Sequence, residues 1–188
     1  MINIGINEAI DLINICTMSW KYYGKIFWIT GLSGSGKSAI GKKLKSLIKN
    51  KYGQTILIHG DDIRDIYNFK TYTKNKRLDL GKSNSNLCHF LSKQGLNVIF
   101  TTVGLFNELH EYNRKNLSNY IEIYIKADIK KLVRNKSKIF YKIKTKNVWG
   151  LDIKPEYPKK PDIIIENKFN SSISKMALNL YQQIISLN

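Results

Sequence analysis

The sequence predicts an α/β fold in which a five-stranded parallel sheet carries helices on both of its faces. Two observations indicate this class. Short apolar runs alternate with longer amphipathic segments along the chain, as strands and helices do in a parallel sheet. The first apolar run, residues 26–30, is followed directly by a glycine-rich loop and then by a helical run. The length of 188 residues is sufficient for one such domain with an ample core.

The individual elements follow from apolar periodicity and from turn residues. Strands are expected at residues 26–30, 55–58, 97–102, 121–125 and 163–165. Helices are expected from the glycine-rich loop to about residue 50, and at residues 78–93, 108–117, 129–134 and 171–187. Ser171 or Ser172 is suited to be the N-cap of the last helix. Residues 1–24 are expected to form a helix and a loop that extend a single domain over residues 1–188.

The composition is that of a globular protein with excess positive charge. The 31 Lys and Arg residues exceed the 14 Asp and Glu residues and give a net charge of +17. This charge either serves a partner with several negative charges or reflects a chain that is rich in lysine throughout. No apolar run approaches the roughly 20 residues of a membrane span. Cys16 and Cys88 form no metal-binding pattern, so we expect a reduced, cytoplasmic protein without membrane contact.

Residues 31–38 carry the motif G-x-x-x-x-G-K-S between the first strand and its helix. Glycines there let consecutive backbone N–H groups surround a phosphate chain, and the N-terminus of the helix attracts the same anion. We expect Lys37 to reach the β- and γ-phosphates of ATP in catalysis and Ser38 to hold Mg²⁺. The expected ATP-binding residues are Gly31, Ser33, Gly34, Ser35, Gly36, Lys37, Ser38 and Ala39.

Three further stretches suggest a site beside this loop. Asp61 and Asp62 follow the second strand, at the edge where α/β sheets bind ligands, although a solvated loop would also explain them. Residues 65–82 mix basic and aromatic side chains. This mixture is typical of a mobile segment that stacks on a base and neutralises phosphate, and it is equally typical of an ordinary surface helix and loop. Residues 136–160 are basic, contain Trp149, and form a loop long enough to be a lid.

In three motifs the sequence resembles the adenylylsulfate (APS) kinase family of P-loop kinases. Residues 28–38 match W-x-T-G-L-S-G-S-G-K-S/T, residues 59–64 match most of D-G-D-N-x-R, and residues 150–161 match G-x-D-x-x-x-E-x-P-x-x-P. The resemblance covers residues 25–167. It implies a P-loop kinase fold with a basic lid, Mg²⁺ as a cofactor, and transfer of the γ-phosphoryl group of ATP to the ribose 3′-hydroxyl of a nucleotide. It also suggests a homodimer.

The resemblance implies roles for individual residues. Asp61 matches the acidic residue that positions and deprotonates the 3′-hydroxyl, so we assign it to catalysis. Arg64 and Arg77 match arginines that bind the acceptor nucleotide. Trp149 is interpreted either as a residue that stacks on a base or as one that pins the lid. The expected acceptor-binding residues are Asp61, Arg64, Arg77, Phe106, Lys146 and Trp149.

Departures from the family pattern concern the acceptor side. His59 and Asp62 stand where the family has Asp and Asn, the family's S-P-Y-R falls on residues 104–107, and its lid phenylalanine falls on Val148. This altered pattern is similar to APS-kinase-like enzymes of capsular polysaccharide pathways, among them enzymes that phosphorylate the 3′-hydroxyl of a cytidine nucleotide, cytidine diphosphoramidate. We favour that acceptor, with adenylylsulfate as the alternative.

Other functions are also compatible with the sequence. The net charge suits a nucleotide-binding regulator or a nucleic-acid-binding ATPase, but the chain has no room for a separate recognition module, so we expect no nucleic-acid partner. The departure at His59 would also suit an inactive scaffold. His59 itself is interpreted equally as a structural residue and as a contact for phosphate or Mg²⁺-bound water. His89 and His110 are interpreted as surface residues of helices.

Overall fold

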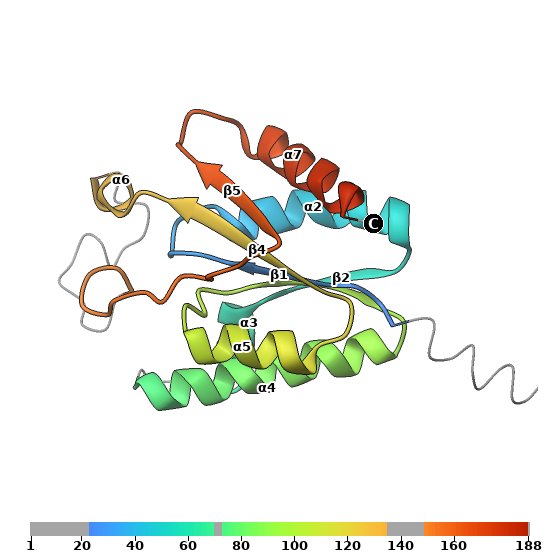
Figure 1. Ribbon diagram of the computed structural model, residues 1–188, viewed down its shortest axis with the longest axis horizontal. Coiled ribbons are helices and arrows are strands. Elements are labelled where there is room, and N and C mark those ends of the chain that lie inside the picture. The colour runs from blue at the N-terminus through green and yellow to red at the C-terminus, as the bar shows by residue number, and fades with distance from the viewer. Residues whose placement is uncertain (1–22, 70–72, 135–148, 188) are drawn as a thin grey trace, which may run out of the picture.

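In a computed structural model, the described residues 23–69, 73–134 and 149–187 are organised around one five-stranded sheet (Figure 1). All of its strand pairs are parallel. The strands are β1 (Ile26–Thr30), β2 (Thr55–His59), β3 (Asn97–Thr101), β4 (Tyr120–Ala127) and β5 (Ile163–Asn167). Their order across the sheet is β2-β3-β1-β4-β5. The predicted α/β class and the predicted five-stranded parallel sheet are confirmed.

Helices cover both faces of this sheet (Figure 1). One face carries α2 (Lys37–Tyr52) and α7 (Ile173–Ser186), and the other carries α3 (Gly60–Ile66), α4 (Lys74–Lys93) and α5 (Asn107–Asn116). A short helix, α6 (Ile129–Arg134), follows the carboxyl end of β4. None of the helices in the described ranges is both long and apolar enough to cross a membrane.

The central strand β1 is buried at every position because its side chains enter two cores, one on each face. On one face Trp28 stacks on Phe100 of β3, with ring centroids 4.6 Å apart, beneath α4 and α5. On the other face Phe27 and Ile29 pack with apolar residues of α2 and α7. Such two-sided burial explains why a short apolar run predicted this strand.

The observed elements differ from the predicted ones mainly in the segment after β2. Helix α3 was not predicted, and α4 begins at Lys74 rather than at residue 78. The N-cap of α7 is Ser172, whose hydroxyl accepts a hydrogen bond from the Lys175 backbone N–H at 3.2 Å. Cys88 is a buried free thiol, and burial raises its pKa. Cys16 and most of the predicted extension at residues 1–24 lie outside the described residues.

Parallel pairing brings the carboxyl ends of all five strands to one edge of the sheet. The glycine-rich loop follows β1 at this edge, and α3 with Asp61 follows β2 there. Only β3 lies between these two strands. The loop and the acidic residue therefore lie along the same edge, as the sequence predicted.

Candidate active site

The loop at residues 31–36 depends on glycine. Gly31, Gly34 and Gly36 have φ angles of +146°, +80° and +99°, which side-chain-bearing residues rarely adopt. At Gly31 a Cβ atom would lie only 2.5 Å from the carbonyl oxygen of Ile125 in β4. The glycines therefore allow the chain to turn closely over the end of the sheet.

Helix α2 begins directly after this loop, without a side-chain cap. Gly36 occupies the N-cap position, and no acidic residue lies in the first turn. The first backbone N–H groups and the positive end of the helix dipole therefore favour an anion at this point. Lys37 is 8% exposed, and its ammonium group donates a hydrogen bond to the carbonyl oxygen of Leu32 at 2.8 Å. A positive charge is thus held against the loop.

Ser35 fixes the loop from its buried side. Its carbonyl oxygen accepts a hydrogen bond from the side-chain amide of Asn167, at the end of β5, at 3.0 Å. Its hydroxyl oxygen is buried and has no hydrogen-bond partner among the described residues. An unpartnered hydroxyl beside an uncapped helix N-terminus fits a bound phosphate chain. All eight expected ATP-binding residues lie in this loop or in the first turn of α2.

Asp61 lies in the first turn of α3, immediately after β2, and its side chain is 82% exposed. The guanidinium of Arg64, one turn later, lies 3.6 Å from its carboxylate. The structure thus brings these two predicted site residues together. His59 precedes them, and its Nδ1 lies 2.7 Å from the hydroxyl of Thr101 at the end of β3. This contact favours the structural interpretation of His59.

Phe106 and Trp149 meet although they are distant in sequence. Their rings pack edge to face with centroids 4.8 Å apart, and both residues are buried. Leu32 of the phosphate loop belongs to the same apolar cluster. Because most of the Trp149 ring is used in this packing, the structure favours the interpretation that it pins the chain. Arg77 lies in α4, whereas Lys146 lies outside the described residues.

Residues 149–162, which we call the strap, are bound to α5. The Glu156 carboxylate accepts a hydrogen bond from the Asn107 backbone N–H at 2.8 Å. Near the other end of the strap, the guanidinium of Arg114 donates to the carbonyl oxygen of Lys160 at 3.0 Å and lies 2.8 Å from a carboxylate oxygen of Asp162. The described part of the predicted lid is therefore packed on the body of the protein, while residues 136–148 lie outside the described ranges.

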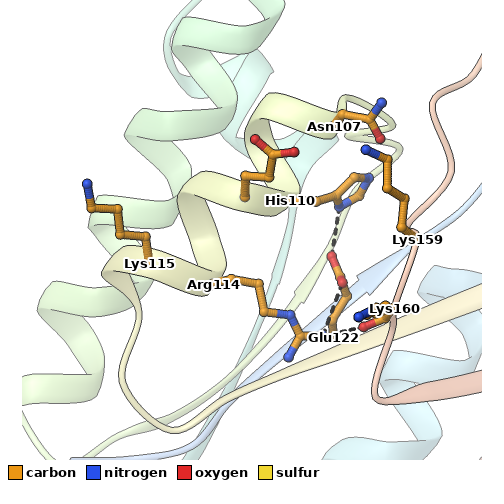
Figure 2. A pocket seen from close by; sticks show the side chains of 8 residues that line it. Asn107, His110, Arg114, Lys115, Glu122, Lys159 and Lys160 are labelled. Atoms are coloured by element: carbon orange, nitrogen blue, oxygen red, sulfur yellow. Dashed lines mark hydrogen bonds and ion pairs between the residues drawn. The ribbon is translucent and has the colours of Figure 1, made fainter.

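Beneath the strap, Glu122 of β4 is the centre of a buried polar cluster (Figure 2). His110 Nδ1 lies 2.7 Å from one of its carboxylate oxygens, and Arg114 lies 3.2 Å from the other. Burial opposes the charge of Arg114, but its contacts with Asp162 and Glu122 raise its pKa, so the guanidinium stays charged. The prediction that His110 is a surface residue is wrong, because it is only 6% exposed. A cavity of about 460 Å³ lies above the cluster, between α5 and Lys160.

A phosphate loop after the central strand and a carboxylate at the same edge of the sheet define a P-loop kinase. The profile of the adenylylsulphate kinase family matches residues 23–166. The cytidine diphosphoramidate kinase of Campylobacter jejuni is 39% identical over 154 residues, which cover 80% of this chain and 90% of that protein. The adenylyl-sulfate kinase of Clostridium kluyveri is 28% identical over 154 residues, covering 79% of this chain and 77% of that protein.

The chain therefore belongs to the adenylylsulphate kinase family, and it is an ATP-using phosphotransferase. A solved structure agrees with this assignment at the level of the fold. The APS kinase of Mycobacterium tuberculosis, in complex with AMPPNP and APS, superposes with a TM-score of 0.78 at 22% identity. The match covers 87% of this chain and 98% of that one.

Proposed function

We propose that this kinase transfers the γ-phosphoryl group of ATP to the ribose 3′-hydroxyl of cytidine diphosphoramidate. The observation that carries this choice of acceptor is the 39% identity to the Campylobacter jejuni cytidine diphosphoramidate kinase over 90% of its length. The adenylyl-sulfate kinase of Clostridium kluyveri is less similar, at 28% identity. The positions that depart from the APS kinase pattern, including His59, Asp62 and residues 104–107, are those that the family resemblance assigns to the acceptor side, which supports an altered acceptor.

The proposed donor site is the phosphate loop with the first turn of α2. Its backbone N–H groups would bind the phosphates of ATP, and Lys37 would stabilise the charge on the transferred group. We propose that Ser38 holds Mg²⁺ together with phosphate oxygens. This fits the donor set, because a hydroxyl oxygen is a ligand that Mg²⁺ accepts and phosphate oxygens and waters usually complete its coordination.

The proposed acceptor site lies between α3, α4 and the strap. Asp61 would orient the 3′-hydroxyl for in-line attack and accept its proton. Its exposure and its place at the carboxyl edge support this role. Arg64 and Arg77 would neutralise the charged groups of the acceptor, and Phe106 with Trp149 would form its apolar wall. Lys146, which belongs to the same proposed set, lies outside the described residues.

A comparison of acceptors tests this proposal. Purified protein is mixed with Mg-ATP and cytidine diphosphoramidate, adenylylsulfate or no acceptor, and both ADP and phosphorylated nucleotide are measured. We expect product with cytidine diphosphoramidate and no ADP above background without an acceptor. The Asp61→Asn variant should lose about 100-fold in turnover, because the base is removed while the shape is kept. A preference for adenylylsulfate would overturn the proposed acceptor, and equal ADP release without an acceptor would overturn the proposed reaction.

We also propose that the enzyme acts in the cytoplasm as a homodimer. Its use of ATP and its reduced Cys88 support the location. The family resemblance supports the dimer. Light scattering on the purified protein should give twice the mass of one chain, and the mass of a single chain would contradict the proposed dimer.

A further inference from the structure

Glu156, in the strap, contacts several segments that are distant in the sequence. One carboxylate oxygen accepts a hydrogen bond from the Asn107 backbone N–H at 2.8 Å, and the other lies 3.1 Å from the ammonium group of Lys74. Its own N–H donates to the carbonyl oxygen of Leu105 at 3.1 Å. Its carbonyl oxygen lies 3.3 Å from Nε2 of His110. Glu156 therefore connects the strap, the start of α5 and the start of α4.

The bond to Asn107 supplies a helix cap from a distant segment. Helix α5 has Phe106 at its N-cap position, and the Phe106 side chain makes no cap hydrogen bond. A negative carboxylate at this end satisfies a backbone N–H and interacts favourably with the helix dipole. The same hydrogen bond is the main reason why the pKa of Glu156 lies below its ordinary value. The hydrogen bond from Asn107 thus favours the charged form of Glu156 in the folded protein.

The partners of Glu156 adjoin the residues of the proposed acceptor site. Asn107 directly follows Phe106, whose ring packs on Trp149 at the beginning of the strap. Lys74 lies one helical turn before Arg77 in α4. A shift of the strap relative to either helix would therefore move the apolar wall, the arginine, or both.

We propose that Glu156 is a positioning residue that holds the strap on the start of α5, and with it Phe106 against Trp149, and so determines how tightly the acceptor nucleotide binds. The inference rests on the proposed function, because it concerns the same acceptor site. Glu156 does not contact the phosphate loop in any recorded hydrogen bond or ion pair of the described residues. Its effect should accordingly fall on the acceptor and not on ATP.

Three variants separate the two contacts of the carboxylate. Glu156→Ala removes both, whereas Glu156→Gln keeps an acceptor oxygen for Asn107 and removes only the charge. Lys74→Met removes the ion pair alone. The matched control is Glu108→Ala, because Glu108 also lies in the first turn of α5 and also pairs with a lysine of α4, Lys82, whereas none of its hydrogen bonds or ion pairs within the described ranges reaches the strap.

Steady-state kinetics with Mg-ATP and cytidine diphosphoramidate, or adenylylsulfate if that is the acceptor used, give the KM of each substrate. For Glu156→Ala we expect the acceptor KM to rise about 10-fold, with the ATP KM changed less than about twofold. Glu156→Gln and Lys74→Met should stay within about threefold of the wild type, because the exposed ion pair contributes little. Glu108→Ala should not change the acceptor KM. Equal changes in both KM values, or no rescue by glutamine, would overturn the proposal.

Hydrogen exchange measured by mass spectrometry gives a readout that needs no acceptor. The amides at residues 105–111 and 149–158 should exchange faster in Glu156→Ala than in Glu108→Ala or the wild type. Unchanged exchange would contradict the positioning role even if the enzyme is active. If the wild type phosphorylates neither nucleotide but the exchange differs as expected, the proposed acceptors fail and the attachment of the strap by Glu156 stands.

Discussion

The proposed donor half and the proposed acceptor half of this kinase are built in different ways. The phosphate loop is one continuous stretch, and its shape comes from glycine backbone angles and the start of α2. The acceptor half is assembled from α3, α4, α5 and the strap, and side chains from distant segments hold it together. The first half can therefore be recognised from a local motif, whereas the second depends on pairs that only the fold brings together.

This difference also indicates how each half tolerates change. A loop whose shape comes mainly from its backbone tolerates changes in nearby side chains, apart from the anchoring amide of Asn167, as long as its glycines are kept. A wall held by pairs of side chains can be altered by changing one pair. The sequence is consistent with this difference between the two halves, because residues 31–38 keep the family motif while residues 104–107 depart from the family pattern.

The sharpest test of the donor half is Lys37→Ala. The ammonium group lies against the phosphate loop at Leu32, so its loss should lower turnover by about 1,000-fold through lost stabilisation of the transferred charge. Circular dichroism should show unchanged helix content. Phosphoryl transfer measured with radiolabelled ATP checks the first expectation, and activity near the wild-type level would mean that this lysine does not act on the phosphate.

The corresponding test of the acceptor half is Glu122→Ala, which removes the centre of the buried cluster. His110, which is buried, and Arg114, which is 38% exposed and keeps Asp162 as a partner, would lose the buried carboxylate that they share, so we expect a loss of about 2.5 kcal/mol in the free energy of unfolding. Urea unfolding followed by circular dichroism measures it. A loss below about 0.5 kcal/mol, typical of a surface substitution, would show that the cluster does not stabilise this half.

Two glycine substitutions test why Gly31 is needed in the loop. The reason is either the close approach of its backbone to the Ile125 carbonyl oxygen or its positive φ angle alone. Gly31→Ala adds a methyl group 2.5 Å from the Ile125 carbonyl oxygen, whereas at Gly53, where φ is +88°, a methyl group meets nothing within 4 Å. We expect losses in unfolding free energy of about 2 kcal/mol and about 1 kcal/mol, respectively. Urea unfolding of both variants gives the comparison, and equal losses would remove the argument from close approach.

The smallest expected effect is a dependence of the free energy of unfolding on pH, caused by the ionisation of Glu156. Its pKa in the folded protein lies below the ordinary 4.5, mainly because of the hydrogen bond from the Asn107 N–H; burial opposes this shift, and Lys74 adds to it. A depressed pKa means that its contribution to stability is present above about pH 4.5 and is lost as the pH falls through the folded value. The difference in unfolding free energy between the wild type and Glu156→Gln should therefore shrink as the pH is lowered from about 5 to about 3. A constant difference would contradict this origin.

Much of the fold could be predicted from the sequence because its strands are short apolar runs, and the interior strands β1 and β3 are buried at every position. Helix α3 was missed because its seven residues begin with Gly60-Asp61-Asp62 and show no apolar periodicity. The first turn of α4 was missed for the same reason, since Lys74 to Arg77 are all polar. Helix α3 packs on β2, whereas the exposed first turn of α4 extends a helix whose buried residues begin at Leu78.

The same limit explains what could and could not be predicted about the candidate site. The phosphate loop is contiguous, so its residues could all be named in advance. The burial of His110 could not, because its partner Glu122 lies on a different element. One weak feature of the sequence indicates the cap formed by Glu156. Phe106 occupies the N-cap position of α5, where a short polar residue is usual, so the cap of this helix has to come from another segment.

The hydrogen bond from Asn167 to Ser35 joins positions 132 residues apart and has a consequence for biosynthesis. A ribosome completes the nucleotide-binding motif early, but the amide that anchors it emerges only with the last strand. Nascent chains and truncated fragments that stop before β5 carry the motif without its anchor. Capture on an immobilised ATP resin should therefore select full-length chains over such fragments during purification.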